Sequence, residues 1–293
     1  MERAKGILYA ALSSSTFGLA PLFTLLLAGG YSPFEALSYR WGVAALFPGA
    51  LAVCSGRSFR LGRRELVTVF LLSLFRAATS LSLVIAYQHI ASGVASTIHF
   101  MYPLAVALAM MCFFREKGSV WVFAAIGMSI VGAVLLSLGN VDFTRGNTTL
   151  GMVSAAVSVV SYGGYIVGVR KSRAVGIDST VLTCYVMGLG ALYFIAGGLV
   201  TGGIRIETDG TAWLCILGVA LPATAVSNMT LVQAIKRIGP TLTSVFGALE
   251  PLTAVVIGVA VFGEPFTVQG AAGILLIVAA VTIVILHSGR RKA

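Results

Sequence analysis

The sequence predicts an all-α polytopic membrane protein with ten transmembrane helices, arranged as two inverted five-helix repeats. Three observations predict it: the composition, the placement of basic residues along the chain, and a similarity between the two halves. Of the 293 residues, 58% are hydrophobic and 10% are charged, and the mean hydropathy is +0.97. Soluble domains carry roughly 25% charged residues, so the bilayer must be the solvent for much of this chain.

The spans are predicted from the apolar runs, since a helix needs about 20 apolar residues to cross the hydrocarbon of a bilayer. The connections are short and rich in Gly, Ser, Asn, Asp and Thr, which leaves no room for a soluble domain. The first run exceeds the apolar part of a signal peptide and is expected to remain as an uncleaved span. The runs lie near residues 4–29, 33–55, 66–87, 92–114, 119–138, 148–170, 178–200, 210–235, 238–263 and 267–287.

The basic residues test this number of spans. With the N-terminus in the cytoplasm, the cytoplasmic segments hold all but four of the 20 Lys and Arg residues. The exceptions are Arg145 and Arg205 in outer connections, and Arg40 and Arg76 within spans. An excess of Lys and Arg marks cytoplasmic connections, so the pattern indicates ten spans with both termini inside. The net charge of +10 therefore reflects topology, and no nucleic-acid partner is expected.

The two halves of the chain are similar to one another. At a shift of 148 residues, segments 77–116 and 225–264 are identical at ten of 40 positions, including Pro103/Pro251 and Glu116/Glu264. A shift of 145 aligns the first span with the sixth. The halves are predicted as residues 1–139 and 140–293. Five spans in each half make the second copy inverted, a recurring transporter design with its site between the repeats near the midplane.

Several motifs carry a family resemblance. They are Ser38-Tyr39-Arg40-Trp41, and the related patterns Tyr102-Pro103-Leu104…Phe114-Arg115-Glu116 and Glu250-Pro251-Leu252…Phe262-Gly263-Glu264. With the duplication, they make the sequence similar to the drug/metabolite transporter superfamily, specifically its ten-span EamA-type exporters. Within that group it most resembles bacterial aromatic amino-acid exporters. The resemblance covers essentially the whole chain and implies alternating access through a central cavity lined by spans 1, 3, 4, 6, 8 and 9, in a bacterial inner membrane.

Three ionisable residues within spans are candidate contacts for a solute, because such groups are costly at membrane depth. Arg76 can bind a substrate carboxylate, or it can pair structurally with Glu250. Glu250 can meet a substrate ammonium or take up a proton, or it can brace Arg76 and the backbone before Pro251. His99 shares a helix face with Tyr102 and can relay protons, or it can be a packing residue with a hydrogen bond.

The remaining candidates are uncharged residues and Arg40. Aromatic residues that can line a cavity for a flat apolar ligand, or simply pack, are Phe17, Tyr102, Tyr162, Tyr165 and Phe246. Polar helpers are Thr16, Ser80 and Asn228, although hydroxyl groups also bond their own helix backbone. Pro103 and Pro251 occupy equivalent positions and are candidate hinges, or static kinks. Arg40 is a candidate gating residue, or it snorkels to the nearby outer surface.

These residues favour a secondary carrier that exports amino acids, aromatic or other apolar ones. Two alternatives stay open: efflux of cationic drugs by the same fold, and a lipid flippase or intramembrane enzyme. The sequence holds no phosphate-binding loop and no nucleophile motif, so neither a cofactor nor an enzymatic activity is expected. The four cysteines lack the spacing of a metal site or a disulfide framework. The expected partners are a small-molecule substrate and membrane lipid.

Overall fold

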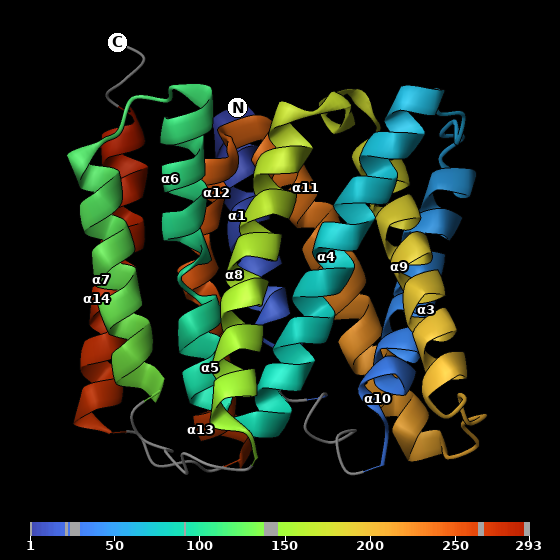
Figure 1. The fold of residues 1–293 in the computed structure, drawn as a ribbon. Coiled ribbons are helices and arrows are strands. Elements are labelled where there is room, and N and C mark those ends of the chain that lie inside the picture. Colours follow the sequence, from blue (N-terminus) through green and yellow to red (C-terminus); the bar gives the residue numbers. More distant parts are fainter. Residues whose placement is uncertain are drawn as a thin grey trace.

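A computed structural model describes residues 2–20, 23, 30–90, 92–137, 146–262 and 267–289. These residues form a bundle of helices that run roughly side by side, and no strand occurs among them (Figure 1). The predicted all-α class is therefore confirmed. The described residues do not include part of the first predicted span, residues 21, 22 and 24–29. They also do not include Arg145, Gly263, Glu264, Arg290, Arg291 and Lys292.

The described helices follow the order of the predicted runs. In residues 1–139 they are α1 (Glu2–Phe17), α3 (Pro33–Cys54), α4 (Arg63–His89), α5 (Ser92–His99), α6 (Tyr102–Phe114) and α7 (Val120–Ser137). In residues 140–293 they are α8 (Thr148–Lys171), η1 (Arg173–Gly176), α9 (Ser179–Thr201), α10 (Gly210–Ala220), η2 (Leu221–Val226), α11 (Ser227–Ile238), α12 (Pro240–Val245), η3 (Phe246–Ala248), α13 (Leu249–Phe262) and α14 (Val268–Gly289).

Eight helical segments among the described residues are long and apolar enough to cross a membrane. Three of these segments combine neighbouring elements: α5 with α6, α10 with η2 and α11, and α12 with η3 and α13. The apolar helix Val120–Leu136 is shorter, and α1 is described over only part of its predicted run. A polytopic membrane protein is thus confirmed, while the number of ten spans stays a prediction.

Polar residues in the short connections start the helices. Ser32 caps α3 by accepting a hydrogen bond from the Glu35 N–H, and the Glu35 carboxylate accepts one from the Ser32 N–H. Asn147, Asp178 and Asp209 cap α8, α9 and α10 with their side-chain oxygens. Such caps satisfy backbone N–H groups that have no partner within the helix, so these four helices begin where their connections supply an acceptor.

Four helix pairs make the most extensive contacts: α1 with α11, α3 with α9, α4 with α8, and α7 with α14. Each pair joins a helix of residues 1–139 to one of residues 140–293, so the two halves share one core. Glycines allow this close approach. A Cβ at Gly6 would meet Arg237 and Ile238, and a Cβ at Gly151 would meet His89 and Ile90. These two contacts involve equivalent positions at the 145- and 148-residue shifts.

Two glycine contacts deeper in the bundle also involve equivalent positions of the two halves. A Cβ at Gly18 would meet Thr253, and the nearest groups to a Cβ at Gly163 are Val106 and Ala105. Gly18 and Gly163 are equivalent, as are Thr253 and Ala105. Close contacts of helices α1 and α8 with the segments near Pro251 and Pro103 therefore follow one pattern in both halves.

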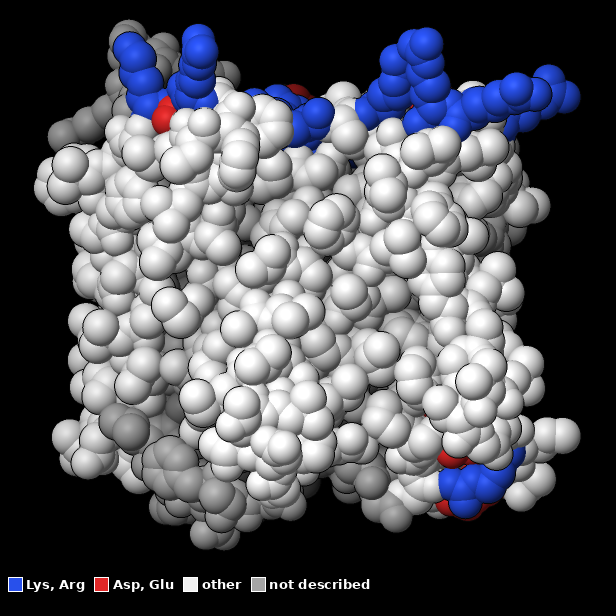
Figure 2. All heavy atoms as spheres, in the orientation of Figure 1, with Lys and Arg blue, Asp and Glu red and all other residues white. Residues whose placement is uncertain are grey.

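On the face drawn in Figure 2, the visible charged side chains lie at the two ends of the bundle, and an uncharged band separates them. Most of the visible Lys and Arg side chains lie at the end where α1 begins and α14 ends. The Arg3 guanidinium donates to the Ile285 carbonyl there, which fixes these two chain ends beside each other. The asymmetric charge distribution is the pattern that the positive-inside rule relates to membrane orientation.

Three of the eight long helical segments are interrupted near their middle. α5 ends at His99 and α6 begins at Tyr102, while α12 and α13 are joined by the 3₁₀ turn η3. These interruptions precede Pro103 and Pro251, because proline has no N–H to donate to the carbonyl four residues earlier and its ring clashes with that carbonyl. In the third, Pro222 lies in the π-helical segment η2, and Thr224 Oγ1 donates to the Val219 carbonyl at 2.7 Å.

Replacing Gly18 with alanine should destabilise the protein. The added Cβ would lie 2.6 Å from the Glu250 carbonyl oxygen and 2.7 Å from Thr253 Cβ. Overpacking of this kind costs about 1–3 kcal/mol, so the melting temperature in detergent, followed by size-exclusion chromatography after heating, should fall. Gly188→Ala is the matched control, since nothing lies within 4 Å of its added Cβ. Equal melting temperatures for the two variants would contradict the close packing at Gly18.

Candidate functional site

The Arg76 side chain lies inside the bundle with only 1% of its surface exposed. Its Nε donates to Asn228 Oδ1 at 2.8 Å, and its Nη1 donates to Ser80 Oγ at 3.3 Å. None of the ion pairs among the described residues involves Arg76. The geometry therefore does not show the alternative, a structural ion pair between Arg76 and Glu250. A permanently charged guanidinium is held by two neutral groups, with further N–H donors to spare.

Three aromatic rings surround the Arg76 guanidinium. Its central carbon lies 5.2 Å from the ring centroid of Tyr162, 5.6 Å from that of Phe17 and 5.8 Å from that of Trp41. Rings at this distance attract a cation through their quadrupole, by about 0.5–2 kcal/mol each. They come from α1, α3 and α8, so the charge is held where elements of both halves meet.

Tyr162 connects Arg76 to a second group of candidates. The His99 ring stacks on Tyr162 with centroids 5.4 Å apart, and Tyr102 meets Tyr162 edge-on at 4.6 Å. His99 Nδ1 lies 2.8 Å from Ser158 Oγ. The Tyr102 hydroxyl donates to Glu250 Oε1 at 3.4 Å. Arg76, the aromatic cluster and Glu250 thus form one continuous constellation, and Arg76 and Glu250 interact electrostatically across it.

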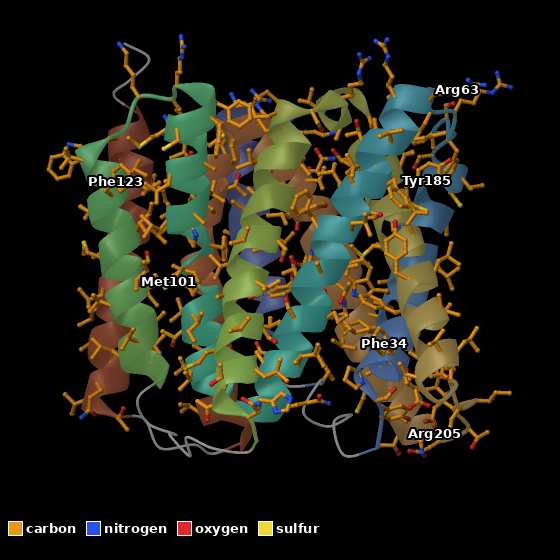
Figure 3. All side chains as sticks on the ribbon, in the orientation of Figure 1. Phe34, Arg63, Met101, Phe123, Tyr185 and Arg205 are labelled. Carbon is orange, nitrogen blue, oxygen red and sulfur yellow. The ribbon has the colours of Figure 1, made fainter. Side chains whose placement is uncertain are left out.

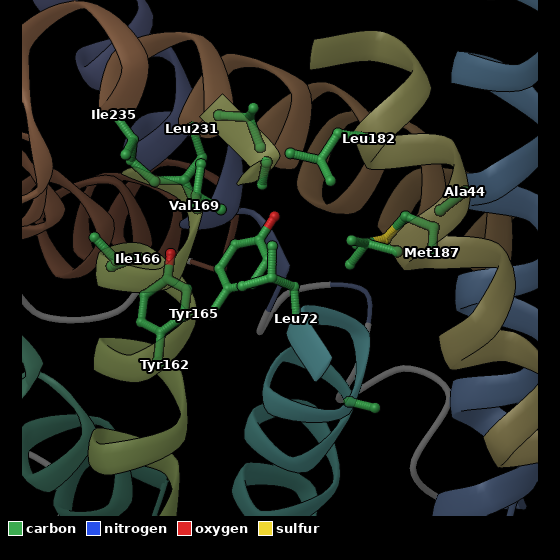
Figure 4. Close-up of a cluster of buried hydrophobic side chains, with 14 of the residues drawn as sticks. Ala44, Leu72, Tyr162, Tyr165, Ile166, Val169, Leu182, Met187, Leu231 and Ile235 are labelled. Carbon is green, nitrogen blue, oxygen red and sulfur yellow. The ribbon is translucent and has the colours of Figure 1, made fainter. Parts of the chain in front are cut away.

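Tyr165 lies one helical turn from Tyr162, and the hydroxyls of both tyrosines stand out among apolar side chains in Figure 4. Tyr165 is completely buried, and its hydroxyl has no hydrogen-bond partner among the described residues. The same holds for Trp41 Nε1 and His99 Nε2. The Ser158 hydroxyl donates to the Ala155 carbonyl and so accepts from His99 Nδ1–H, which leaves Nε2 as an acceptor. Buried polar groups normally have partners, so the two donors and the one acceptor require an explanation. A bound solute with acceptor oxygens would explain the two donors.

Arg40 points into this region and does not snorkel to the outer surface. Its Nε donates to Thr224 Oγ1 at 2.7 Å, and its guanidinium carbon lies 6.0 Å from the Phe17 ring centroid. Thr224 belongs to the π-helical segment η2. Single π turns within α-helices are frequent at functional sites, because they aim side chains that a regular helix would point elsewhere.

Two predicted contacts lie apart from the constellation or point away from it. Thr16 donates to the Leu12 and Ser13 carbonyls of its own helix, so the hydrogen of its hydroxyl is used in backbone hydrogen bonds. Phe246 packs in a separate apolar cluster with Ala107, Val245 and Ile126. Pro103 and Pro251 lie at the start of helices just after the interruptions described above, next to Tyr102 and Glu250.

The structure adds residues that the sequence did not single out as contacts: Trp41, Ser158, Thr224 and Gly247. A Cβ at Gly247 would coincide with the Tyr102 hydroxyl, so only glycine leaves room for that hydroxyl to reach Glu250. Trp41 follows Arg40 in the chain, and Thr224 is equivalent to Arg76 at the 148-residue shift. Its equivalence to Arg76 could have identified Thr224 as a candidate site residue from the sequence.

A second polar cluster lies near one end of the bundle, where α3 begins. The Glu35 carboxylate is 3% exposed as a residue and accepts from Arg205 N, Nε and Nη2 at 2.9, 3.2 and 3.3 Å. These hydrogen bonds raise the pKa of the Arg205 guanidinium above its ordinary value. Figure 3 shows Arg205 and Phe34 near this end and Arg63 at the other. A cavity of about 200 Å³ beside Glu35 is lined by the connection between α9 and α10.

Comparisons with known proteins agree with this architecture. A family model described as the EamA-like transporter family matches residues 4–138 and, separately, residues 149–286. The chain belongs to the EamA-like transporter family. It is therefore a multi-pass membrane transporter, and the family's description is that of a carrier and not of an enzyme.

Relatives of this EamA-like chain extend over most of its length. It is 25% identical over 238 residues to a protein of Archaeoglobus fulgidus named an uncharacterized transporter, covering 81% of this chain and 83% of that one. It is also 25% identical over 284 residues to a protein of Bacillus subtilis named uncharacterized transporter YojE, and the match covers 91% of this chain and 88% of that protein. A crystal structure at 19% identity has a TM-score of 0.82 and covers 100% of this chain and 99% of the other, which supports the fold alone.

Replacing Gly247 with alanine should displace the Tyr102 ring. The added methyl group would occupy the position of the Tyr102 hydroxyl, at a cost of about 1–3 kcal/mol. Adding Tyr102→Phe should recover part of the loss, because the hydroxyl is then absent. Melting temperatures of the two single variants and the double variant form a cycle with an expected coupling of ~0.5–3 kcal/mol. Gly127→Ala is the control, with nothing within 4 Å; strictly additive effects would contradict the contact.

Proposed function

We propose that this EamA-like transporter is a secondary carrier that exports small metabolites, and that amino acids are its substrates. The observation that carries the proposal is Arg76, which is buried at 1% exposure without an acidic partner among the described residues. An unpaired charge at membrane depth is costly and marks a substrate path or a binding site. A carboxylate can accept two parallel hydrogen bonds from one guanidinium, which makes it the fitting partner.

The groups around Arg76 match the rest of an amino acid. Glu250 is partly buried, and its carboxyl group can receive the substrate ammonium. The Phe17, Tyr102 and Tyr162 rings offer flat apolar surfaces for the substrate side chain, which favours aromatic and other apolar amino acids. Trp41 Nε1 and the Tyr165 hydroxyl supply two further donors that have no partner among the described residues.

We also propose the architecture that alternating access requires: ten spans in two inverted halves, residues 1–139 and 140–293. The family model matches each half once, which supports the division. The paired glycine contacts and the interruptions before Pro103 and Pro251 support it further. In this proposal the interruptions are hinges, Arg40 gates the outer side, and the solute binds between the halves.

The proposed setting is the inner membrane of a bacterium, with both termini in the cytoplasm. The charge distribution supports this orientation, since the basic end of the bundle holds the start of α1 and the end of α14. The Glu35–Arg205 cluster then lies at the outer surface.

Export is tested by flux from proteoliposomes loaded with single labelled amino acids, including aromatic, aliphatic, acidic and amide members. We expect flux above that of empty liposomes for some members, and a loss of about tenfold or more in Arg76→Gln, because a charge-assisted contact is removed. Arg57→Gln is the matched control, since Arg57 pairs with Asp178 at the basic end.

Other outcomes separate the competing functions. No flux of any amino acid, together with flux of other solutes, would reject the proposed substrate. Cation transport that depends on Glu250 and survives Arg76→Gln would favour drug efflux. That alternative gains no support from the site, where two guanidiniums face a single carboxyl group.

A further inference from the structure

The constellation around Arg76 contains an excess of positive charge. The charged side chains gathered there are Arg40, Arg76 and Glu250: both guanidiniums lie beside the Phe17 ring, and the Glu250 carboxyl group accepts from the Tyr102 hydroxyl. Neither arginine forms an ion pair among the described residues. An amino acid with one ammonium and one carboxylate adds no net charge, so it leaves this excess in place.

The two guanidiniums lie beside the same aromatic ring. Each lies within 6.0 Å of the Phe17 ring centroid, Arg76 at 5.6 Å and Arg40 at 6.0 Å. Arg40 is partly buried, and its one hydrogen bond among the described residues uses Nε, with Thr224 Oγ1 as acceptor. Its terminal nitrogens therefore remain donors without a partner in the part of the chain that the structure describes.

The position of Arg40 also argues against a purely structural role. A snorkelling arginine extends toward the interface, where water and headgroups hydrate its charge. Arg40 instead reaches Thr224, whose hydroxyl already donates to the Val219 carbonyl within the π-helical turn. This anchor fixes the guanidinium beside Phe17 and neutralises none of its charge.

We infer that the substrate carries a second acidic group, which binds Arg40 while the α-carboxylate binds Arg76. The inference rests on the proposed transport of amino acids and changes the side-chain preference stated there: the substrate is an amino acid or derivative with two acidic groups, and not one with a purely apolar side chain. Both arginines lie beside the Phe17 ring, so this ring is placed to contact the carbon chain that joins the acidic groups. Glu250 keeps its role toward the ammonium.

The test compares acids with their amides, which have nearly the same shape. Affinities of the purified full-length protein are measured for L-glutamate against L-glutamine and for L-aspartate against L-asparagine, in chloride-free buffer. We expect an acid to bind about tenfold more tightly than its amide, as one charge-assisted contact predicts. Arg40→Gln should remove this preference, so that acid and amide bind with equal affinity, while Arg76→Gln weakens the binding of both. Arg57→Gln should behave as the unmodified protein.

The outcomes distinguish this inference from the proposed function. Equal binding of acids and amides by the unmodified protein, with amino acids still transported, would overturn the inference and leave the proposed function standing. An acid preference that persists in Arg40→Gln would also overturn it. Loss of the preference when chloride is added would assign Arg40 to an inorganic anion instead. Absence of binding and flux for every amino acid would reject the proposed function itself.

Discussion

The buried charge of Arg76 is the constraint on which the rest of the candidate site depends. Its guanidinium contacts pairs of positions that are equivalent in the two halves of the sequence: Ser80 with Asn228, and Phe17 with Tyr162. A charge inside the bundle needs hydrogen bonds, ring faces or a counter-ion. The structure supplies the first two from both halves, and so binds the halves together; in the proposed function a solute supplies the third.

The equivalent positions keep their packing and differ in their chemistry. Gly6 and Gly151 give the same close helix contacts, and Gly18 and Gly163 face equivalent segments, although the contact at Gly18 is the tighter of the two. In the constellation, however, Tyr102 is equivalent to Glu250, His99 to Gly247, and Arg76 to Thr224. The backbone scaffold is therefore nearly symmetric, while the charges are not. An asymmetric solute with an acidic and a basic end can then bind in one orientation, which a strictly symmetric site would not enforce.

The sequence predicted the helical class, the order of the apolar segments and the cluster of Arg76, Tyr102, Tyr162 and Glu250, because composition and charge at membrane depth leave few alternatives. It did not predict that Phe246 packs in another cluster or that Thr16 bonds its own helix, since helix rotation is set by neighbouring helices. The sequence did not predict the roles of Trp41 and the π-helical Thr224, because only their contacts with Arg76 and Arg40 distinguish them from other aromatic and hydroxyl residues in the spans.

The interruptions connect this site to movement. The turns before Pro103 and Pro251 lie beside Tyr102 and Glu250, whose side chains meet at 3.4 Å across the two segments. Rotation of either helix segment at its interruption would change that separation, and with it the distance from Glu250 to Arg76. An ammonium placed between Glu250 and a carboxylate held by Arg76 would resist such a change. In the proposed function, occupancy of the site and the arrangement of the two interrupted helices are therefore energetically linked, which is what a carrier requires if solute binding is to bias its conformational equilibrium.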